Sequence, residues 1–187
     1  MKQQFYKVLL GTESSACRGL HYKINDITVA PHWNPNGETP VEMGGFSIAT
    51  REALIRWIFR GNILYDVIIP EDAEIVYPQH AFADGDIARV NKIIITNPRP
   101  VTDKIALNLY KYSHFPRVEY YRVLAGCAIC GYEETCEAIM KDHIDQNNAA
   151  DCLNVFKYWA KPSDVSYPSD GVLYDKIVHK LEQLCHS

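Results

Sequence analysis

Residues 92–100 read Lys92-Ile93-Ile94-Ile95-Thr96-Asn97-Pro98-Arg99-Pro100, and the spacing of the apolar residues changes across this stretch. Before it, apolar residues form short runs that proline and glycine interrupt, which is typical of strands. After it, they recur every three to four residues, which is typical of helices. The sequence therefore predicts an α+β protein, with a β-rich module over residues 1–100 and a helical module over residues 101–187.

The first half contains runs of β-branched and aromatic residues that have the length of strands. They cover residues 6–10, 46–48, 63–69, 73–76 and 90–95. One helix interrupts them, with Thr50 in the N-cap position and Gly61 at its end. We therefore expect a mixed or antiparallel sheet with one helix in this module.

The second half shows the three-to-four residue spacing of amphipathic helices. Four or five helices joined by short loops account for it, which predicts a helical bundle. The apolar faces consist of Ile105, Leu109 and Tyr112; Tyr120, Leu124 and Cys127; Cys136, Ile139, Met140, His143 and Ile144; Leu153, Phe156 and Ala160; and Leu173, Ile177, Leu181 and Leu184.

The composition is that of an ordinary globular chain, with 187 residues, 47% of them apolar and 22% charged, and a formal net charge of -4. This net charge argues against nucleic-acid binding through phosphate neutralisation. Charged residues interrupt the N-terminus before an apolar run of signal-peptide length, and no apolar run approaches the length of a membrane span. We therefore expect a cytoplasmic protein that binds neither membranes nor nucleic acid.

Several short motifs follow one another between residues 5 and 97. They are Gly19-Leu20-His21-Tyr22, Asn34-Pro35-Asn36-Gly37, Gly44-Gly45-Phe46, Ile69-Pro70-Glu71-Asp72-Ala73 and Lys92-Ile93-Ile94. Their order resembles that of a group of uncharacterised proteins and domains of giant DNA viruses and bacteriophages, carried as domains of unknown function. The resemblance implies a viral or phage-type protein, found in the host cell or the virion interior, and it implies no chemistry.

The cysteines suggest one candidate metal site. Without an export signal, the six cysteines are expected to be free thiols or metal ligands rather than disulfides. Cys127 and Cys130 form a Cys-x-x-Cys-Gly turn, and Cys136 and His143 lie seven residues apart on one helical face. Such a set can hold a structural zinc ion. The alternative is that all four residues pack in the apolar faces of two helices.

Polar residues of the first half suggest a candidate catalytic site. Their layout looks loosely like that of an ADP-ribosyltransferase acting on NAD, in which a carboxylate stabilises a ribosyl cation and a cation holds the pyrophosphate. Members of the viral and phage group that the chain resembles often carry tyrosine two residues after the Gly-Gly step, where this chain has Ser47. No Glu-x-Glu motif follows. The residues concerned are Arg18, His21, Ser47 and an acid among Glu74, Asp84 and Asp86.

Two other segments are candidates for partner binding. The first is the long loop from Ala30 to Gly44, with Trp33, Asn34 and Asn36, because long unpatterned loops are often functional. The second is the aromatic segment 110–121, with Tyr112, Phe115 and Arg117. The leading hypothesis is a non-catalytic interaction or assembly module that binds a viral or host protein and needs no cofactor. An ADP-ribosyltransferase-like enzyme is the alternative.

Overall fold

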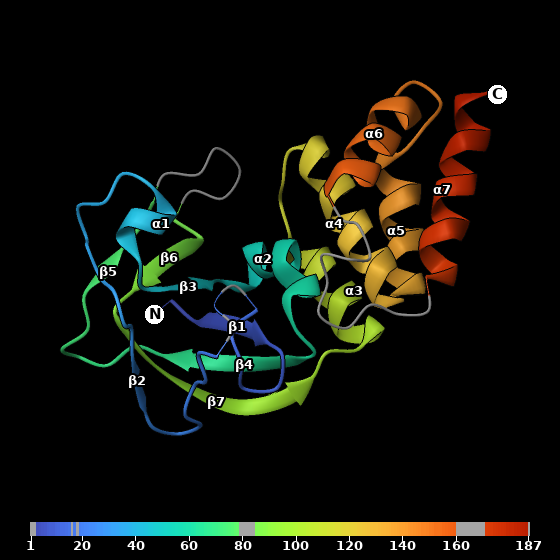
Figure 1. Cartoon of the computed structure of the whole chain (residues 1–187). Coiled ribbons are helices and arrows are strands. Elements are labelled where there is room, and N and C mark those ends of the chain that lie inside the picture. The colour runs from blue at the N-terminus through green and yellow to red at the C-terminus, as the bar shows by residue number, and fades with distance from the viewer. Residues whose placement is uncertain (1–2, 16, 18, 79–84, 160–170, 187) are drawn as a thin grey trace.

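The computed structural model places a β-sheet beside a bundle of helices, with a short helical segment between them (Figure 1). It describes residues 3–15, 17, 19–78, 85–159 and 171–186. The strands all lie in the first half of the chain and the long helices in the second, which confirms the α+β prediction. The change falls between Pro100, where the last strand ends, and Asp103, where the next helix begins.

The described residues contribute seven strands to one sheet, in the order β2-β7-β4-β1-β3-β6-β5. Every pair of neighbouring strands is antiparallel. The bounds are Phe5–Leu9 for β1, Ile27–Val29 for β2, Phe46–Ala49 for β3, Ile63–Ile68 for β4, Ile75–Val76 for β5, Ile87–Val90 for β6 and Lys92–Pro100 for β7.

The run predicted as a single strand over 90–95 is divided between two strands. β6 ends at Val90 and β7 begins at Lys92, and these strands lie on opposite sides of β1 in the sheet. Asn91 makes the transition, and its side-chain oxygen accepts a hydrogen bond from the backbone N–H of Glu74 at 2.9 Å. The buried residues change phase across Asn91, from Ala88 and Val90 in β6 to Ile93 and Ile95 in β7. The sequence hides this change, because residues 93–95 are three consecutive isoleucines and show no alternation.

The sheet half contains more helix than the sequence predicts. α1, Pro40–Met43, lies within the predicted loop and begins with a capping box between Thr39 and Glu42. The predicted helix after Thr50 consists of α2, Arg51–Leu54, and the 3₁₀ segment η1, Ile55–Arg60. The hydroxyl of Thr50 does not cap α2 but donates to Asp86 Oδ1 at 2.8 Å.

Five helices of the described residues follow the sheet, in agreement with the expected four or five. They are α3, Asp103–Tyr112; α4, Arg117–Cys130; α5, Glu133–His143; α6, Ala149–Trp159; and α7, Val172–Cys185. Most residues of the predicted apolar faces are buried, and Ala160 lies outside the described residues. Tyr112 is an exception, because it is 43% exposed and lies against the guanidinium of Arg51, whose Cζ is 3.4 Å from the ring centroid.

Two apolar clusters lie on the two faces of the sheet. One face packs against α2, η1 and the helices of the second half, so that Val8, Ala49 and Ile87 share a cluster with Ile58 and Leu124. The opposite face buries a second cluster, which includes Phe5, Leu9, Phe46 and Ile48 under the chain segment that carries Tyr22. The sheet is therefore covered on both faces where β1 and β3 lie.

Candidate functional site

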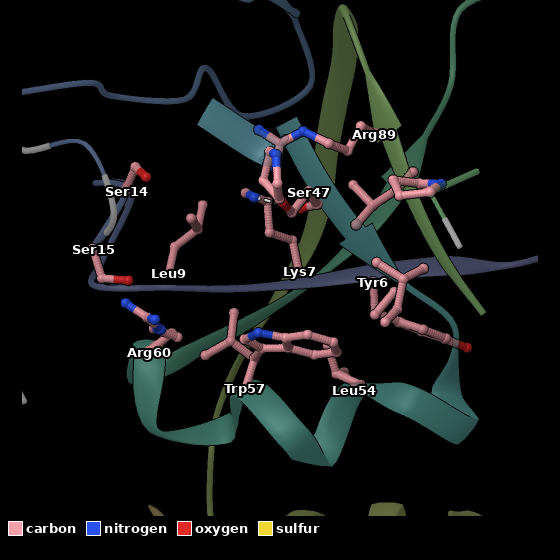
Figure 2. A pocket seen from close by; sticks show the side chains of 16 residues that line it. Tyr6, Lys7, Leu9, Ser14, Ser15, Ser47, Leu54, Trp57, Arg60 and Arg89 are labelled. Atoms are coloured by element: carbon pink, nitrogen blue, oxygen red, sulfur yellow. Dashed lines mark hydrogen bonds between the residues drawn. The ribbon is translucent and has the colours of Figure 1, made fainter. Parts of the chain in front are cut away.

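A cavity of about 310 Å³ lies where the middle strand of the sheet, β1, separates from its neighbour β3 (Figure 2). β1 pairs with β4 along its whole length, from Phe5–Val67 to Leu9–Ile63. Its pairing with β3 is confined to Tyr6 and Ala49. Beyond this pair the strands part, so Lys7, Val8 and Leu9 on one side and Ser47 and Ile48 on the other face the cavity.

The cavity receives side chains from both faces of the sheet. Side chains alternate along a strand, so Lys7 belongs to the face that carries Phe5 and Leu9. Ser47 and Arg89 lie opposite each other on β3 and β6 and belong to the other face. Because the strands are not paired here, Lys7 Nζ reaches the carbonyl oxygen of Ser47 and donates to it at 2.6 Å.

The cavity wall is largely apolar on the side of the helices. Leu54 and Trp57, from α2 and η1, approach from that side in Figure 2, and Val8 and Ile87 extend the wall. Leu54 is buried at 2% exposure in the cluster that joins the sheet to the helices. A bound apolar group would therefore contact a preformed surface.

Arg89 is held in a fixed orientation by the Gly-Gly step that precedes β3. Its Nε donates to the carbonyl oxygen of Gly44 at 2.6 Å, and its Nη1 donates to Ser47 Oγ at 2.9 Å. Its Nη2 also donates to the carbonyl oxygens of Gly44 and Gly45. A guanidinium has five N–H groups, and these four contacts use four of them. One N–H of Nη1 is left for another acceptor.

The two glycines are required by close packing as well as by their backbone. Gly44 and Gly45 have φ values of 63° and 67°. A Cβ at Gly45 would lie 2.6 Å from ring atoms of Trp33, and a Cβ at Gly44 would lie 2.4 Å from the carbonyl oxygen of His32. The Gly-Gly step thus lets the 32–33 segment approach and presents carbonyl groups to Arg89.

Three cations line the cavity, and they come from three different elements: Lys7 from β1, Arg60 from the end of η1 and Arg89 from β6. No carboxylate lines the cavity among the described residues. Within that part of the chain, none of the three cations forms an ion pair either. The cavity is therefore positively charged in a protein whose net charge is -4.

The environment of Lys7 weakens its protonated form. Removal from water, and then the positive charge of Arg89, lower the pKa of the Lys7 amine to about 7. Burial also lowers the pKa of Arg89, although the guanidinium stays charged. The phenol of Tyr22, whose ring centroid is 5.3 Å from Lys7 Nζ, has a raised pKa because it is buried.

Of the residues predicted to be catalytic, Ser47 lines the cavity and the other described ones do not. His21 is exposed, with Nδ1 3.4 Å from Thr12 Oγ1. Asp86 accepts from Thr50, and Glu74 accepts a hydrogen bond from Trp33 Nε1 at 2.8 Å. Arg18 and Asp84 lie outside the described residues.

The predicted binding loop is more ordered than its sequence indicates. Trp33 packs over Gly45, and the N–H of Asn34 donates to the carbonyl oxygen of Met43 at 2.8 Å. The side chain of Asn34 accepts from the N–H of Asn36 at 3.2 Å, and both asparagines are exposed.

The aromatic segment divides between core and surface. Tyr110, Tyr120 and Tyr121 are buried, whereas Tyr112 is exposed. Phe115 is half-buried with its ring centroid 5.7 Å from that of Tyr120, and Arg117 is exposed at the start of α4.

The four predicted zinc ligands occupy different surroundings. Cys127 and Cys136 are buried between α4 and α5, and burial raises the pKa of both thiols. Cys130 is half-buried, and His143 stacks on Tyr120 with ring centroids 3.8 Å apart. Across the described ranges, no group of three or more His, Cys, Asp or Glu side chains is placed to hold a metal ion. Zinc binding stays a prediction.

Sequence reasoning missed Lys7, Trp57, Arg60 and Arg89 as site residues. A signal was present for Lys7, because it stands between Phe5 and Leu9 on the buried face of a strand. A charged side chain rarely occupies such a position unless it has a partner or a function. Arg60 and Arg89 gave no comparable signal, since arginine at a helix end or on a short strand is common.

Comparison with known proteins adds no relative. No protein-family model, no curated protein and no solved structure matches the chain. Within the residues described, no helix combines the length and the apolar character that a membrane span requires.

Proposed function

We propose that this protein binds a small organic anion in the cavity between β1 and β3. The ligand class is a carboxylate or phosphate attached to an apolar or aromatic group. The observation that carries the proposal is the presence of Lys7, Arg60 and Arg89 on one cavity whose described lining includes no carboxylate.

The charge supports an anion. Arg89 is half-buried and forms no ion pair with a described carboxylate, and an anionic ligand would offset the cost of withdrawing such a cation from water. Arginine binds carboxylate and phosphate oxygens through paired N–H groups, and such charge-assisted bonds are about twice as strong as neutral ones. Arg89 is already oriented by its bonds to Gly44 and Ser47, so little side-chain entropy would be lost on binding.

The size and lining support a small ligand with an apolar part. A volume of about 310 Å³ lies at the lower end of the range for small-molecule sites, roughly 300–1,000 Å³. Trp57 and Leu54 offer an aromatic and an aliphatic surface beside the cations. This combination suits an aromatic or branched acid better than a free inorganic ion.

The proposed anion binding bears differently on each hypothesis drawn from the sequence. Ligand binding without catalysis agrees with the leading hypothesis of a non-catalytic protein. Partner binding by Trp33, Asn34, Asn36, Tyr112, Phe115 and Arg117 remains a prediction, as does the viral or phage-type origin. Among the described residues that the ADP-ribosyltransferase-like alternative would use, Ser47 is the one that lines the cavity. We therefore propose ligand binding in preference to that enzyme activity.

Calorimetric titration tests the proposal with benzoate and phenyl phosphate, which share an aromatic ring but differ in the anion. We expect at least one to bind in the micromolar to millimolar range that suits a fragment of this size. Benzyl alcohol, which is uncharged, should bind at least about tenfold more weakly, because it lacks the charge-assisted bonds.

Matched variants locate the binding site. Arg60→Gln removes one cavity cation and should weaken binding of the anion by about tenfold or more, which is the effect of losing a hydrogen bond to a charged group. Lys104→Gln removes an exposed cation on α3 and should leave the affinity unchanged. Failure of both anions to bind, equal binding of benzyl alcohol, or equal effects of the two variants would overturn the proposal.

A further inference from the structure

Lys7 is placed as a nucleophile within the cavity. Its Nζ lies at the gap between β1 and β3, where it donates to the carbonyl oxygen of Ser47. In Figure 2 the Lys7 side chain rises from β1 toward Ser47 and Arg89, away from the helix that carries Trp57. One hydrogen bond to a carbonyl leaves the nitrogen lone pair of a neutral amine available.

The groups around Lys7 favour a neutral amine. Arg89 on β6 and Arg60 on η1 line the same cavity as Lys7. The ring of Tyr22 lies beside the Lys7 amine, and Tyr65 is the residue paired with Lys7 on β4. None of these groups is a carboxylate that would hold the ammonium form, and burial keeps Tyr22 as a neutral phenol. With a pKa of about 7, close to half of the Lys7 side chains are unprotonated at neutral pH. A lysine desolvated beside another cation is the usual form of an activated amine.

We infer that Lys7 forms a reversible imine with an aldehyde or ketone carried by the bound organic anion. This inference rests on the proposed function, because Arg60 and Arg89 would hold the anionic group while the carbonyl carbon meets Lys7 Nζ. It narrows the ligand class to anions that carry a carbonyl group.

The reaction balances without an oxidant or reductant. The nitrogen lone pair of Lys7 adds to the carbonyl carbon as the carbon–oxygen π bond opens, and one of the two nitrogen protons passes to the oxygen to give a carbinolamine. That intermediate loses its hydroxyl group together with the remaining nitrogen proton as water, which leaves a carbon–nitrogen double bond. Addition of water reverses the sequence and releases the ligand.

The test uses 4-formylbenzoate, an aromatic carboxylate with one aldehyde, on the full chain. Sodium cyanoborohydride reduces any imine to a stable secondary amine, and mass spectrometry of peptides identifies the modified lysine. We expect modification of Lys7 ahead of all other lysines, with a rate that rises through pH 7 as the amine loses its proton. Exposed lysines should require a pH nearer their ordinary pKa of about 10.4.

Three comparisons complete the experiment. Benzoate should protect Lys7 by competition, benzaldehyde should label it more slowly because it lacks the anion, and Lys7→Arg should lose the adduct because it has no primary amine. Lys104→Arg is the matched variant and should retain the Lys7 adduct. Because the peptide mapping is done on the wild-type protein, the result does not depend on the folding of any variant.

The outcomes separate the two proposals. If benzoate binds in calorimetry but 4-formylbenzoate labels lysines according to their exposure, the imine is refuted and anion binding stands. Equal labelling of Lys7 by benzaldehyde and 4-formylbenzoate would show that the anionic group does not direct the reaction, and would refute an imine formed by a bound organic anion. If neither benzoate nor phenyl phosphate binds, the proposed function itself fails.

Discussion

Lys7 Nζ donates a hydrogen bond of 2.6 Å to the carbonyl oxygen of Ser47 across the opening between β1 and β3. In a continuous antiparallel pair this carbonyl would be reached by a backbone N–H of the neighbouring strand. A side-chain amine has taken that place because the two strands pair only at Tyr6 and Ala49. The same opening creates the cavity, so the gap in the sheet and the proposed site have one structural origin.

The stability of the protein should depend on the ionisation of Lys7. The folded-state pKa of this amine lies at about 7, and the unfolded-state pKa at about 10.4. Between these values the unfolded chain binds one proton more than the folded chain, so the free energy of unfolding rises with pH across this window. Lys7→Met should reduce the rise in stability between pH 7 and pH 9, as measured by urea unfolding. Lys104→Met, on an exposed face of α3, should keep it; equal pH dependence in all three proteins would contradict the prediction.

The Gly-Gly step should tolerate no side chain. Gly45→Ala places a Cβ 2.6 Å from the Trp33 ring on a backbone with φ of 67°. The left-handed backbone alone costs about 1–2 kcal/mol for a residue with a side chain, and the contact with Trp33 adds to it. Thermal or urea unfolding measures the loss.

Gly11→Ala is the matched control for this substitution. Gly11 has a similar φ of 58°, but a Cβ there would meet no atom within 4 Å. Gly45→Ala should therefore be the more destabilising change. It should also lower the affinity for benzoate, because the Gly44 and Gly45 carbonyl oxygens orient Arg89. Equal losses in the two variants would show that the Trp33 contact contributes nothing.

The buried ion pair between η1 and α4 should be essential for stability. Glu119 Oε2 accepts from Arg56 Nε at 2.8 Å, and Glu119 Oε1 lies 2.9 Å from Arg122 Nη1. Glu119→Ala takes this carboxylate away from two arginines, and removal of one member of a buried pair typically costs about 3–5 kcal/mol. Urea unfolding of the purified variant measures the cost.

A surface pair provides the comparison for Glu119. Glu133 pairs with Lys176 on the surface, where each side chain is 55% exposed. Glu133→Ala should change stability little, because exposed ion pairs are weak. A loss as large as that of Glu119→Ala would show that burial does not decide the effect.

The six cysteines should differ in reactivity according to their burial. Cys17 and Cys185 are exposed and should react at once with a thiol reagent in the native protein. Cys127, Cys136 and Cys152 are buried, and burial raises their thiol pKa values, so they should react after unfolding. The half-buried Cys130 should fall between these groups.

A metal assay completes the thiol experiment. If Cys127, Cys130, Cys136 and His143 hold zinc, the native protein should contain one zinc ion per chain by elemental analysis. A chelator should then speed the reaction of the three thiols. Protection of Cys127 and Cys136 in a zinc-free protein would instead attribute it to packing alone.

Much of the local structure follows from the sequence because it depends on near neighbours. The alternation along Tyr6 to Leu9 and the apolar run at Ile63 predict strands, and the stripe of Tyr120, Leu124 and Cys127 predicts a helix. The failures also have local causes. Three residues, Ile27–Val29, are too few to show a period, and the single residue Asn91 turns one apparent strand into two.

The spacing and type of the residues determined most of the strands and helices, and that a sheet half precedes a helical half. Tertiary structure alone decided that β1 and β3 are neighbours, that they part after Tyr6, and that Lys7, Arg60 and Arg89 meet there. The physical reason is that secondary structure reflects the repeat of side chains along a few residues. A cavity, in contrast, depends on strand order and on contacts between residues far apart in the chain, such as Lys7 with Ser47 and Arg89 with Gly44, which no local pattern encodes.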